Sequence, residues 1–379
     1  MKGPFKLLVF ASYLGSGGAE KHTVRLLNHL DPKAFEIYVV TPNKKGTYEQ
    51  DLLPHIRLIK IGSKKAFQLS ATLARLSCIL PLRKQINRLQ PDLVITVTDL
   101  HTLIYLYATK GVKRKVKHIA LVQNTISETY GKTVSLTKKI IYSSILSQYH
   151  KIDKIVAISQ GVAQDLLHLM PALEQKVMII YNIGIDQDLQ TKASPIAISE
   201  NRPIVLACGR LVPQKGYPYL IKAFAQMRSK VPATLLILGE GKLMDEVVQL
   251  IKDYRLQDHV KLLGFRANPY EYMASADLFV LSSVYEGFGN VIVEAMACNA
   301  PVISTDCPHG PSEIIQHGIN GWLVPVKDPD KLATSMSELL LNQELRNTLR
   351  KNGMKRAMDF EASKIAHQYE KLMQSLLIN

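Results

Sequence analysis

The chain has 379 residues, more than one hydrophobic core usually serves, and with 47% hydrophobic and 21% charged residues its composition is that of a soluble globular protein. Its four cysteines, Cys78, Cys208, Cys298 and Cys307, are widely scattered and form no C-x-x-C pair, so no disulfide or zinc framework is visible. Their apolar or loop contexts suit reduced thiols in a cytosol. No run of about 18 apolar residues occurs, so no membrane-spanning helix is predicted.

The formal net charge of +15 belongs entirely to the first half of the chain. Residues 1–185 contain 26 Lys and Arg against 11 Asp and Glu, a net of +15, whereas residues 186–379 contain 21 against 21. Such an excess indicates an anionic partner. Segment 63–89 mixes cations with Leu, Ile and Phe, and the basic residues carry no nucleic-acid-binding motif. We therefore expect an anionic membrane surface and no nucleic acid, with a basic surface for solubility as the alternative.

The first apolar run, residues 6–12, is predicted to be a β-strand and not a secretory signal, because it is short and leads directly into a glycine-rich loop. Similar runs follow through the first half, at 35–41, 56–62, 92–98, 117–123, 154–159 and 176–182. Continuous Val, Ile and Leu runs of this kind are typical of parallel strands that are buried on both faces.

The glycine-rich stretch "GSGGAEKH" (15–22) lies between the first strand and a predicted helix. A dinucleotide fingerprint needs glycine where Glu20 stands, so the pattern argues against a nicotinamide cofactor. The turn around Gly18 allows backbone N–H groups at a helix N-terminus to approach a phosphate or sugar. An ordinary tight turn is the alternative.

A second series of strands follows the polar stretch 186–202, at 203–209, 234–240, 260–265, 278–283, 301–306 and 321–326. We therefore predict an α/β protein with two Rossmann-like, doubly wound parallel-sheet domains, residues 1–185 and 203–359, joined by the linker 186–202. Ligands of such domains lie beyond the carboxyl ends of the strands, so we expect the two domains to face a cleft.

The loop "GRLVPQKG" (209–216) follows the first strand of the second series and contains Arg210 and Lys215. It is not a P-loop, because the G-K-[ST] ending is absent. Two cations at the carboxyl end of a strand favour a diphosphate clamp over a solvated surface pair. In "GEGKLM" (239–244), Met244 replaces the third glycine of a dinucleotide loop, which favours a strand-to-helix turn.

The stretch "YEGFGNVIVEAMA" (285–297) places Glu286 on a loop and Glu294 in the first turns of a predicted helix. Retaining hydrolases hold two carboxyl groups about 5 Å apart, whereas eight helical residues rise about 12 Å. The spacing therefore favours two contacts with one nucleotide sugar over an acid/base pair. Gly287 and Gly289 allow backbone N–H groups to face such a ligand.

Acidic residues elsewhere in the second half have simpler interpretations. In "CPHGPSEII" (307–315), Glu313 either helps to close the site or begins a helix. Of the two D-x-D triplets, 186–188 lies in the linker and 328–330 resembles a capped helix start, so we predict no metal site.

The motifs together resemble glycosyltransferase family 4, whose members have the GT-B fold: "GGAE" (17–20), "AISQGVAQDL" (157–166), "GRLVPQKG" (209–216), "EGFGNVIVE" (286–294) and "GPSEII...HGINGWLVP" (310–325). The resemblance covers nearly the whole chain, and the E-x7-E element combined with the Arg/Lys loop is highly specific. It implies a retaining, metal-independent sugar transfer, without a cofactor, from a nucleotide diphosphate sugar bound mainly by the second domain.

The resemblance also implies roles for the charged residues. Arg210 and Lys215 would neutralise the leaving diphosphate, Glu294 would bind the ribose hydroxyls, and Glu286 would contact the donor sugar near the reacting carbon. Fixed cations at the diphosphate stabilise the transition state without a metal. Front-face attack would let the departing phosphate oxygen take the proton of the acceptor.

Further donor contacts are implied for Phe288, Gly289 and Asn290, whose backbone groups would hold sugar and phosphate, and for the backbone near Arg266, which would hold the base. Many family members place a histidine after the fifth strand of the first domain, where this chain has Asn124. An asparagine can hydrogen-bond a sugar hydroxyl but cannot handle a proton.

The resemblance suggests that the amphipathic segment 360–379 crosses back to the first domain; a terminal helix of the second domain is the alternative. We expect a cytoplasmic enzyme, peripheral at the inner face of the cell membrane. It would move a hexose or N-acetylhexosamine from a nucleotide diphosphate sugar, expected to be a UDP-sugar, to a glycan or lipid-linked acceptor. A nucleotide-sugar epimerase and a non-catalytic sugar-nucleotide-binding subunit are the alternatives.

Overall fold

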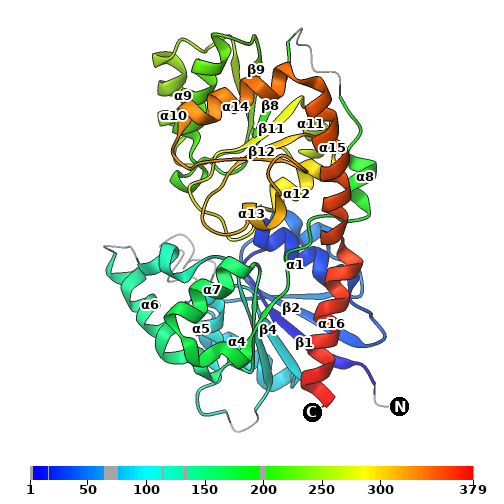
Figure 1. Cartoon of the computed structure of the whole chain (residues 1–379). Helices are drawn as coiled ribbons and strands as arrows, with labels where there is room; N and C mark the ends of the chain where they lie inside the picture. Colours follow the sequence, from blue (N-terminus) through cyan, green and yellow to red (C-terminus); the bar gives the residue numbers. More distant parts are fainter. Residues whose placement is uncertain are drawn as a thin grey trace. The chain divides into compact units, whose positions relative to one another are not determined.

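The computed structural model forms two compact units (Figure 1). It describes residues 3–15, 17–63, 76–112, 115–131, 135–196 and 202–378. Unit 1 comprises Met1–Ile183 and Ala362–Asn379, and unit 2 comprises Gly184–Glu361. The chain therefore passes from one unit to the other twice, each time two residues from a boundary predicted from the sequence.

Unit 1 is built on a seven-stranded parallel sheet in the order β3-β2-β1-β4-β5-β6-β7. Its strands coincide with the seven apolar runs of the first half: β1 (Phe5–Phe10), β2 (Phe35–Pro42), β3 (Arg57–Ile61), β4 (Leu93–Thr96), β5 (Lys117–Val122), β6 (Lys154–Ala157) and β7 (Val177–Ile179). Leu7 and Val9 pack into one core cluster, and Leu8 and Phe10 into another. Successive side chains of the strand thus pack on opposite faces of the sheet. Because both faces are buried, polar and apolar residues do not alternate along the strand.

The helices of unit 1 cover both faces of this sheet (Figure 1). α1 (Gly18–His29) and α16 (Ala362–Ile378) contribute to one core, whereas α4 (Ile79–Leu89) and α5 (Asp99–Ala108) contribute to the other. The remaining helical segments are η1 (Thr47–Asp51), the π-helix η2 (Ser127–Gly131), α6 (Leu136–Gln148), η3 (Tyr149–Lys151), α7 (Gln160–Leu169) and η4 (Pro171–Lys176).

Unit 2 is built on a six-stranded parallel sheet in the order β10-β9-β8-β11-β12-β13. Its strands coincide with the six apolar runs of the second half: β8 (Ile204–Cys208), β9 (Thr234–Leu238), β10 (Val260–Gly264), β11 (Leu278–Leu281), β12 (Val302–Thr305) and β13 (Trp322–Val324). The two sheets confirm the predicted α/β architecture of two Rossmann-like parallel-sheet domains.

The helices of unit 2 are α8 (Asp188–Lys192), η5 (Pro213–Lys215), α9 (Tyr217–Arg228), α10 (Met244–Asp253), α11 (Tyr270–Ala274), α12 (Asn290–Ala297), α13 (Pro311–Ile314), α14 (Pro329–Leu341), α15 (Gln343–Ala357) and η6 (Met358–Phe360). The predicted linker 186–202 is not wholly irregular, because α8 lies in it and contacts α11. The Asp328 carboxylate accepts a hydrogen bond from the Lys331 backbone N–H at 2.9 Å, so the second D-x-D triplet caps a helix.

All four cysteines are free thiols. Within the described ranges, no helix is both long enough and apolar enough to cross a membrane. The cation-rich segment 63–89 is described at residue 63 and from residue 76 onward, and residues 64–75 of that prediction lie outside the described residues.

Candidate functional site

Lys215 ends the short helix η5 at the carboxyl end of the unit 2 sheet. The next residue, Gly216, has φ +63°, and a Cβ there would lie 2.1 Å from the Ser282 carbonyl oxygen. Only glycine allows this close approach in a left-handed conformation. The Ser282 hydroxyl donates to the Lys215 carbonyl at 2.8 Å. The Lys215 loop is therefore fixed to the residues that follow β11.

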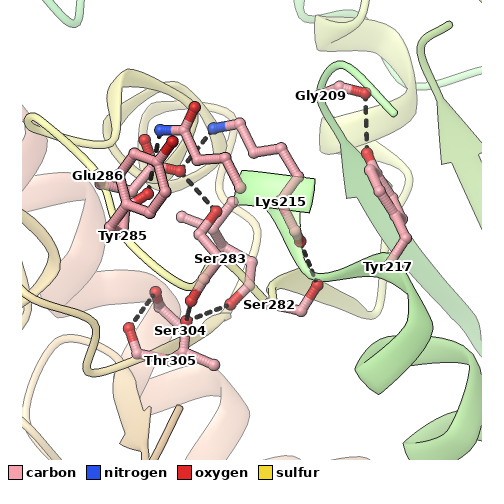
Figure 2. A network of polar contacts seen from close by, with 11 residues as sticks. Gly209, Lys215, Tyr217, Ser282, Ser283, Tyr285, Glu286, Ser304 and Thr305 are labelled. Atoms are coloured by element: carbon pink, nitrogen blue, oxygen red, sulfur yellow. Dashed lines mark hydrogen bonds and ion pairs between the residues drawn. The ribbon is translucent and has the colours of Figure 1, made fainter. Parts of the chain in front are cut away.

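The central feature of the site is a buried ion pair between Lys215 and Glu286 (Figure 2). Lys215 Nζ lies 2.5 Å from Glu286 Oε1, and the two side chains are only 15% and 8% exposed. The Ser283 hydroxyl donates to the same carboxylate oxygen at 2.5 Å. Buried charges are tolerated when they are paired and hydrogen-bonded, so each group depends on the other two.

Further hydrogen bonds fix the backbone carbonyls of Ser283 and Tyr285, which lie close to Glu286 in the sequence (Figure 2). The Thr305 hydroxyl, at the end of β12, donates to the Ser283 carbonyl at 2.5 Å. Gln214 Nε2 donates to the Tyr285 carbonyl at 3.0 Å. Ser283 and Thr305 are not among the residues predicted for the site, although both are hydroxyl residues at the carboxyl ends of apolar runs, a position that could have identified them.

Two titratable side chains near Glu286 are kept neutral. Burial, and next the Glu286 charge, raise the pKa of the Cys307 thiol. Burial likewise raises the pKa of Tyr217 well above its ordinary value, with smaller contributions from Cys208 and Glu286, and the Tyr217 hydroxyl donates to the Gly209 carbonyl at 2.8 Å. A buried protonated thiol is a poor nucleophile, so Cys307 is a poor candidate for covalent chemistry at this site.

The second predicted glutamate, Glu294, lies on α12 and is buried. The Tyr270 hydroxyl, on α11, donates to Glu294 Oε1 at 3.3 Å. Gly289 precedes α12 with φ +98°, a conformation that suits glycine, while Phe288 is buried and Asn290 is half-buried. The hydrogen bond from Tyr270 to Glu294 is thus separate from the contacts of Glu286 with Lys215 and Ser283.

The two predicted arginines are exposed on loops that follow β8 and β10, two strands that are separated by β9 in the sheet. Arg210 follows β8, where a Cβ on Gly239 would lie 2.0 Å from the Gly209 carbonyl oxygen. The loop after β8 and the turn between β9 and α10 therefore pack against each other. Arg266 follows β10, and its neighbour Phe265 donates its N–H to Glu240 Oε1 at 3.4 Å.

Gly18 and Asn124 belong to unit 1, whereas the other predicted site residues belong to unit 2. Gly18 is the exposed first residue of α1, and the Glu20 carboxylate accepts a hydrogen bond from the Ser12 hydroxyl at 2.6 Å. An acid so close to this helix N-terminus disfavours a dinucleotide pyrophosphate there. Asn124 is half-buried on the loop after β5.

In the part of the chain that the structure describes, no group of three or more His, Cys, Asp or Glu side chains is arranged to hold a metal ion.

Comparison with known proteins finds two family models that together match residues 16–356. The family model described as "Glycosyltransferase Family 4" matches residues 16–189, and "Glycosyl transferases group 1" matches residues 189–356. The chain is 32% identical over 366 residues to an N-acetylgalactosaminyltransferase of Campylobacter jejuni, covering 95% of this chain and 97% of that protein. The chain belongs to glycosyltransferase family 4.

Other similarities of this glycosyltransferase extend along the chain. The N-acetyl-alpha-D-glucosaminyl L-malate synthase of Bacillus anthracis is 28% identical over 73% of this chain and 72% of that protein. The crystal structure of Anabaena HepE with UDP-glucose has a TM-score of 0.81 at 23% identity and covers 98% of this chain and 99% of that one. The HepE structure shows a shared fold, and the Campylobacter and Bacillus relatives favour a sugar transferase over the epimerase and the non-catalytic subunit.

Proposed function

We propose that this glycosyltransferase moves a hexose or N-acetylhexosamine from a UDP-sugar to a glycan or lipid-linked acceptor, with retention of anomeric configuration and without a metal ion. The observation that carries the proposal is the buried Lys215–Glu286 pair, at the carboxyl ends of the unit 2 strands and shortly before α12. The Campylobacter relative is named as acting on a diphospho-undecaprenol-linked sugar, and HepE was crystallised with UDP-glucose.

The proposed chemistry assigns charged side chains to three parts of the donor: the diphosphate, the sugar and the ribose. Cleavage of the sugar–phosphate bond leaves negative charge on the diphosphate, which Lys215 and the exposed Arg210 would neutralise. Because Glu286 and Ser283 already hold Lys215 in place, little reorganisation is needed as the charge develops. Glu286 would contact the donor sugar, and the buried Glu294 the ribose hydroxyls. The remaining donor contacts would come from the backbone at 288–290 and near Arg266.

The proton balance requires no second carboxylate. In a front-face reaction, the acceptor oxygen forms a bond to the anomeric carbon on the same side as the breaking bond to phosphate. The departing phosphate oxygen takes the proton of the acceptor hydroxyl, and the products are the glycoside and UDP. This proposal needs no nucleophilic side chain, and Cys307 is held in its neutral form.

We further propose that unit 1 meets an anionic membrane that carries the acceptor, at the cytoplasmic face. The large apolar side chains that are exposed on its helices include Leu80 on α4, which is 73% exposed, and Leu136 and Ile140 on α6, which are 72% and 59% exposed. Exposed cations, Lys84 and Lys139, lie on the same two helices, and both helices contact α5. Apolar side chains among cations suit an interface with anionic lipid.

The proposed function is tested by a donor screen on the full chain. Hexose and N-acetylhexosamine derivatives of UDP, GDP and ADP are incubated with and without an undecaprenyl-diphosphate-linked sugar, and free nucleotide is measured. We expect acceptor-dependent release of UDP. Release from no donor would contradict the proposal, and a free epimerised sugar nucleotide formed without acceptor would select the epimerase.

A further inference from the structure

Phe288, in the loop proposed to hold the donor, packs against Phe360, which lies near the C-terminal end of unit 2 in the sequence. Its ring lies 5.2 Å from the ring of Phe360, edge to face at 66°, and both side chains are buried. Phe360 ends η6, just before the chain leaves unit 2 for α16. An edge-to-face pair is directional, so it orients Phe288 as well as burying it.

Arg356, on the last turn of α15, connects Phe360 with α13. Its guanidinium lies 4.8 Å from the centroid of the Phe360 ring. Arg356 Nη2 donates to the Glu313 carbonyl at 2.7 Å, and Nε donates to the Ile314 carbonyl at 3.2 Å. These carbonyls belong to the last two residues of α13, so Arg356 caps that helix while it stacks on Phe360.

The start of α13 lies against the backbone of Phe288. Gly310, the residue before α13, has φ +95°, and a Cβ there would lie 2.3 Å from the Phe288 carbonyl oxygen. The Glu286 N–H donates to the Pro308 carbonyl at 3.4 Å. Arg356 therefore supports Phe288 along two routes, through Phe360 to its ring and through α13 to its backbone.

The chain enters unit 2 at Gly184, and this residue contacts Phe360 and α12. The Gly184 N–H donates to the Phe360 carbonyl at 2.9 Å. A Cβ on Gly184 would lie 2.2 Å from Val293 Cγ1, on α12 next to Glu294. Both segments at which the chain enters and leaves unit 2 are thus fixed to the donor loop and to α12.

We propose that Arg356 and Phe360 are positioning residues that hold the backbone of the donor loop, 286–290, in its binding geometry. This inference rests on the proposed function, because it assumes that the nucleotide-sugar diphosphate binds at this loop. Neither side chain needs to touch the ligand. A planar guanidinium can stack on a ring and donate in two directions at once, whereas a lysine ammonium cannot reproduce both contacts.

The chain offers a matched control. Arg346, also on α15, donates from Nη1 to the Leu339 carbonyl at 2.7 Å and so caps α14 in the way that Arg356 caps α13. Arg346→Ala is therefore expected to lower thermal stability without altering the donor loop.

The test compares Arg356→Ala, Arg356→Lys, Phe360→Leu and Arg346→Ala with the wild-type full chain. Amide hydrogen exchange of residues 285–291 is measured without ligand, and the Kd of UDP is measured by calorimetry. For Arg356→Ala we expect about tenfold faster exchange and a Kd about tenfold higher, a difference of about 1.4 kcal/mol. Arg356→Lys and Phe360→Leu are expected to show smaller changes in the same direction. They keep the test decisive if the alanine variant does not fold.

Unchanged exchange and Kd in both Arg356→Lys and Phe360→Leu would overturn the inference, and so would an equal effect of Arg346→Ala. A wild-type protein that does not bind UDP contradicts the proposed donor instead. The exchange measurement then still decides the positioning role, because it requires no ligand.

Discussion

At the scale of single residues, the site depends on a largely buried ion pair whose carboxylate also accepts a hydrogen bond from one hydroxyl group. Lys215, Glu286 and Ser283 meet at one carboxylate oxygen. Removing either charge leaves the other buried without its partner, which is costlier than losing an exposed pair. A change at this pair is therefore expected to affect both the local structure and the proposed stabilisation of the leaving diphosphate.

Lys215→Ala is expected to lower kcat by about 10²- to 10³-fold, because it removes a preorganised cation from the developing negative charge. Glu286→Gln keeps an acceptor for Ser283 but loses the ion pair, and is expected to lower kcat as well. Nucleotide release at saturating donor measures both. Lys222→Ala, at an exposed position on α9, is the control and is expected to match wild type. Wild-type kcat in Lys215→Ala would contradict the assignment.

Buried histidines in unit 1 predict acid sensitivity. Burial lowers the pKa of His118 from 6.5 to about 3, and burial with the nearby Arg25 charge lowers that of His22 to about 3. Below pH 6.5 the unfolded chain binds protons that the folded chain does not. Each histidine therefore contributes stability that is present above pH 6.5 and is lost toward pH 3, at roughly 1.4 kcal/mol per pH unit.

Urea unfolding between pH 7 and pH 4, followed by circular dichroism, tests this prediction. His118→Gln cannot bind the proton in either state, so its stability is expected to fall less steeply than that of wild type. It is expected to be less stable than wild type at pH 7, because the Thr96 hydroxyl loses its contact with His118 Nε2 at 2.9 Å and keeps the one with the Thr102 hydroxyl at 2.7 Å. Parallel curves for the two proteins would contradict the prediction.

At the scale of elements, short turns at the carboxyl ends of strands carry the site, and glycines set their paths. Gly310 and Gly318 make a matched pair, since both have positive φ, at +95° and +75°. A Cβ on Gly310 meets the Phe288 backbone, whereas nothing lies within 4 Å of a Cβ on Gly318.

Gly318→Ala is expected to cost about 1–2 kcal/mol of stability from strain alone and to leave activity unchanged. Gly310→Ala must also displace the Phe288 backbone, so we expect the KM of the donor to rise about tenfold or more. Thermal unfolding and donor titrations separate the two effects. Equal KM values in the two variants would show that α13 does not position the donor loop.

The elements were predictable from the sequence because their strands are buried on both faces and read as unbroken apolar runs. The helix α8 was not predicted, since it lies in a polar stretch without apolar periodicity and packs on α11. Within the site, the turn glycines and both glutamates could be located from local patterns. The pairing of Lys215 with Glu286 could not, because the two are separated by 71 positions and only the parallel sheet brings them together.

At the scale of the whole molecule, the net charge is distributed unevenly between the two halves of the chain. Residues 1–185 carry the entire net charge of +15, and residues 186–379 are neutral. The basic half also exposes Leu136 and Ile140 on α6, a helix on which Lys139 is exposed as well. We therefore expect binding to anionic vesicles that weakens as salt is added, since exposed charges are screened.

The double variant Leu136→Ser/Ile140→Ser is expected to bind anionic vesicles about tenfold more weakly in a sedimentation assay, because it removes apolar area from the interface. Leu341→Ser is the control, since Leu341 is 73% exposed on α14 of unit 2 and Leu136 is 72% exposed. Equal binding of wild type to neutral vesicles, or equal loss in the control, would contradict the membrane proposal.

Proton NMR of the glycoside that the full chain forms in buffer containing EDTA tests together whether the transfer retains the anomeric configuration and whether it needs a metal ion. The anomeric coupling constant of the transferred sugar reports its configuration. We predict that the product keeps the configuration of the UDP-sugar and forms as fast as without EDTA. A product with inverted configuration, or no product once divalent metal is removed, would contradict the account.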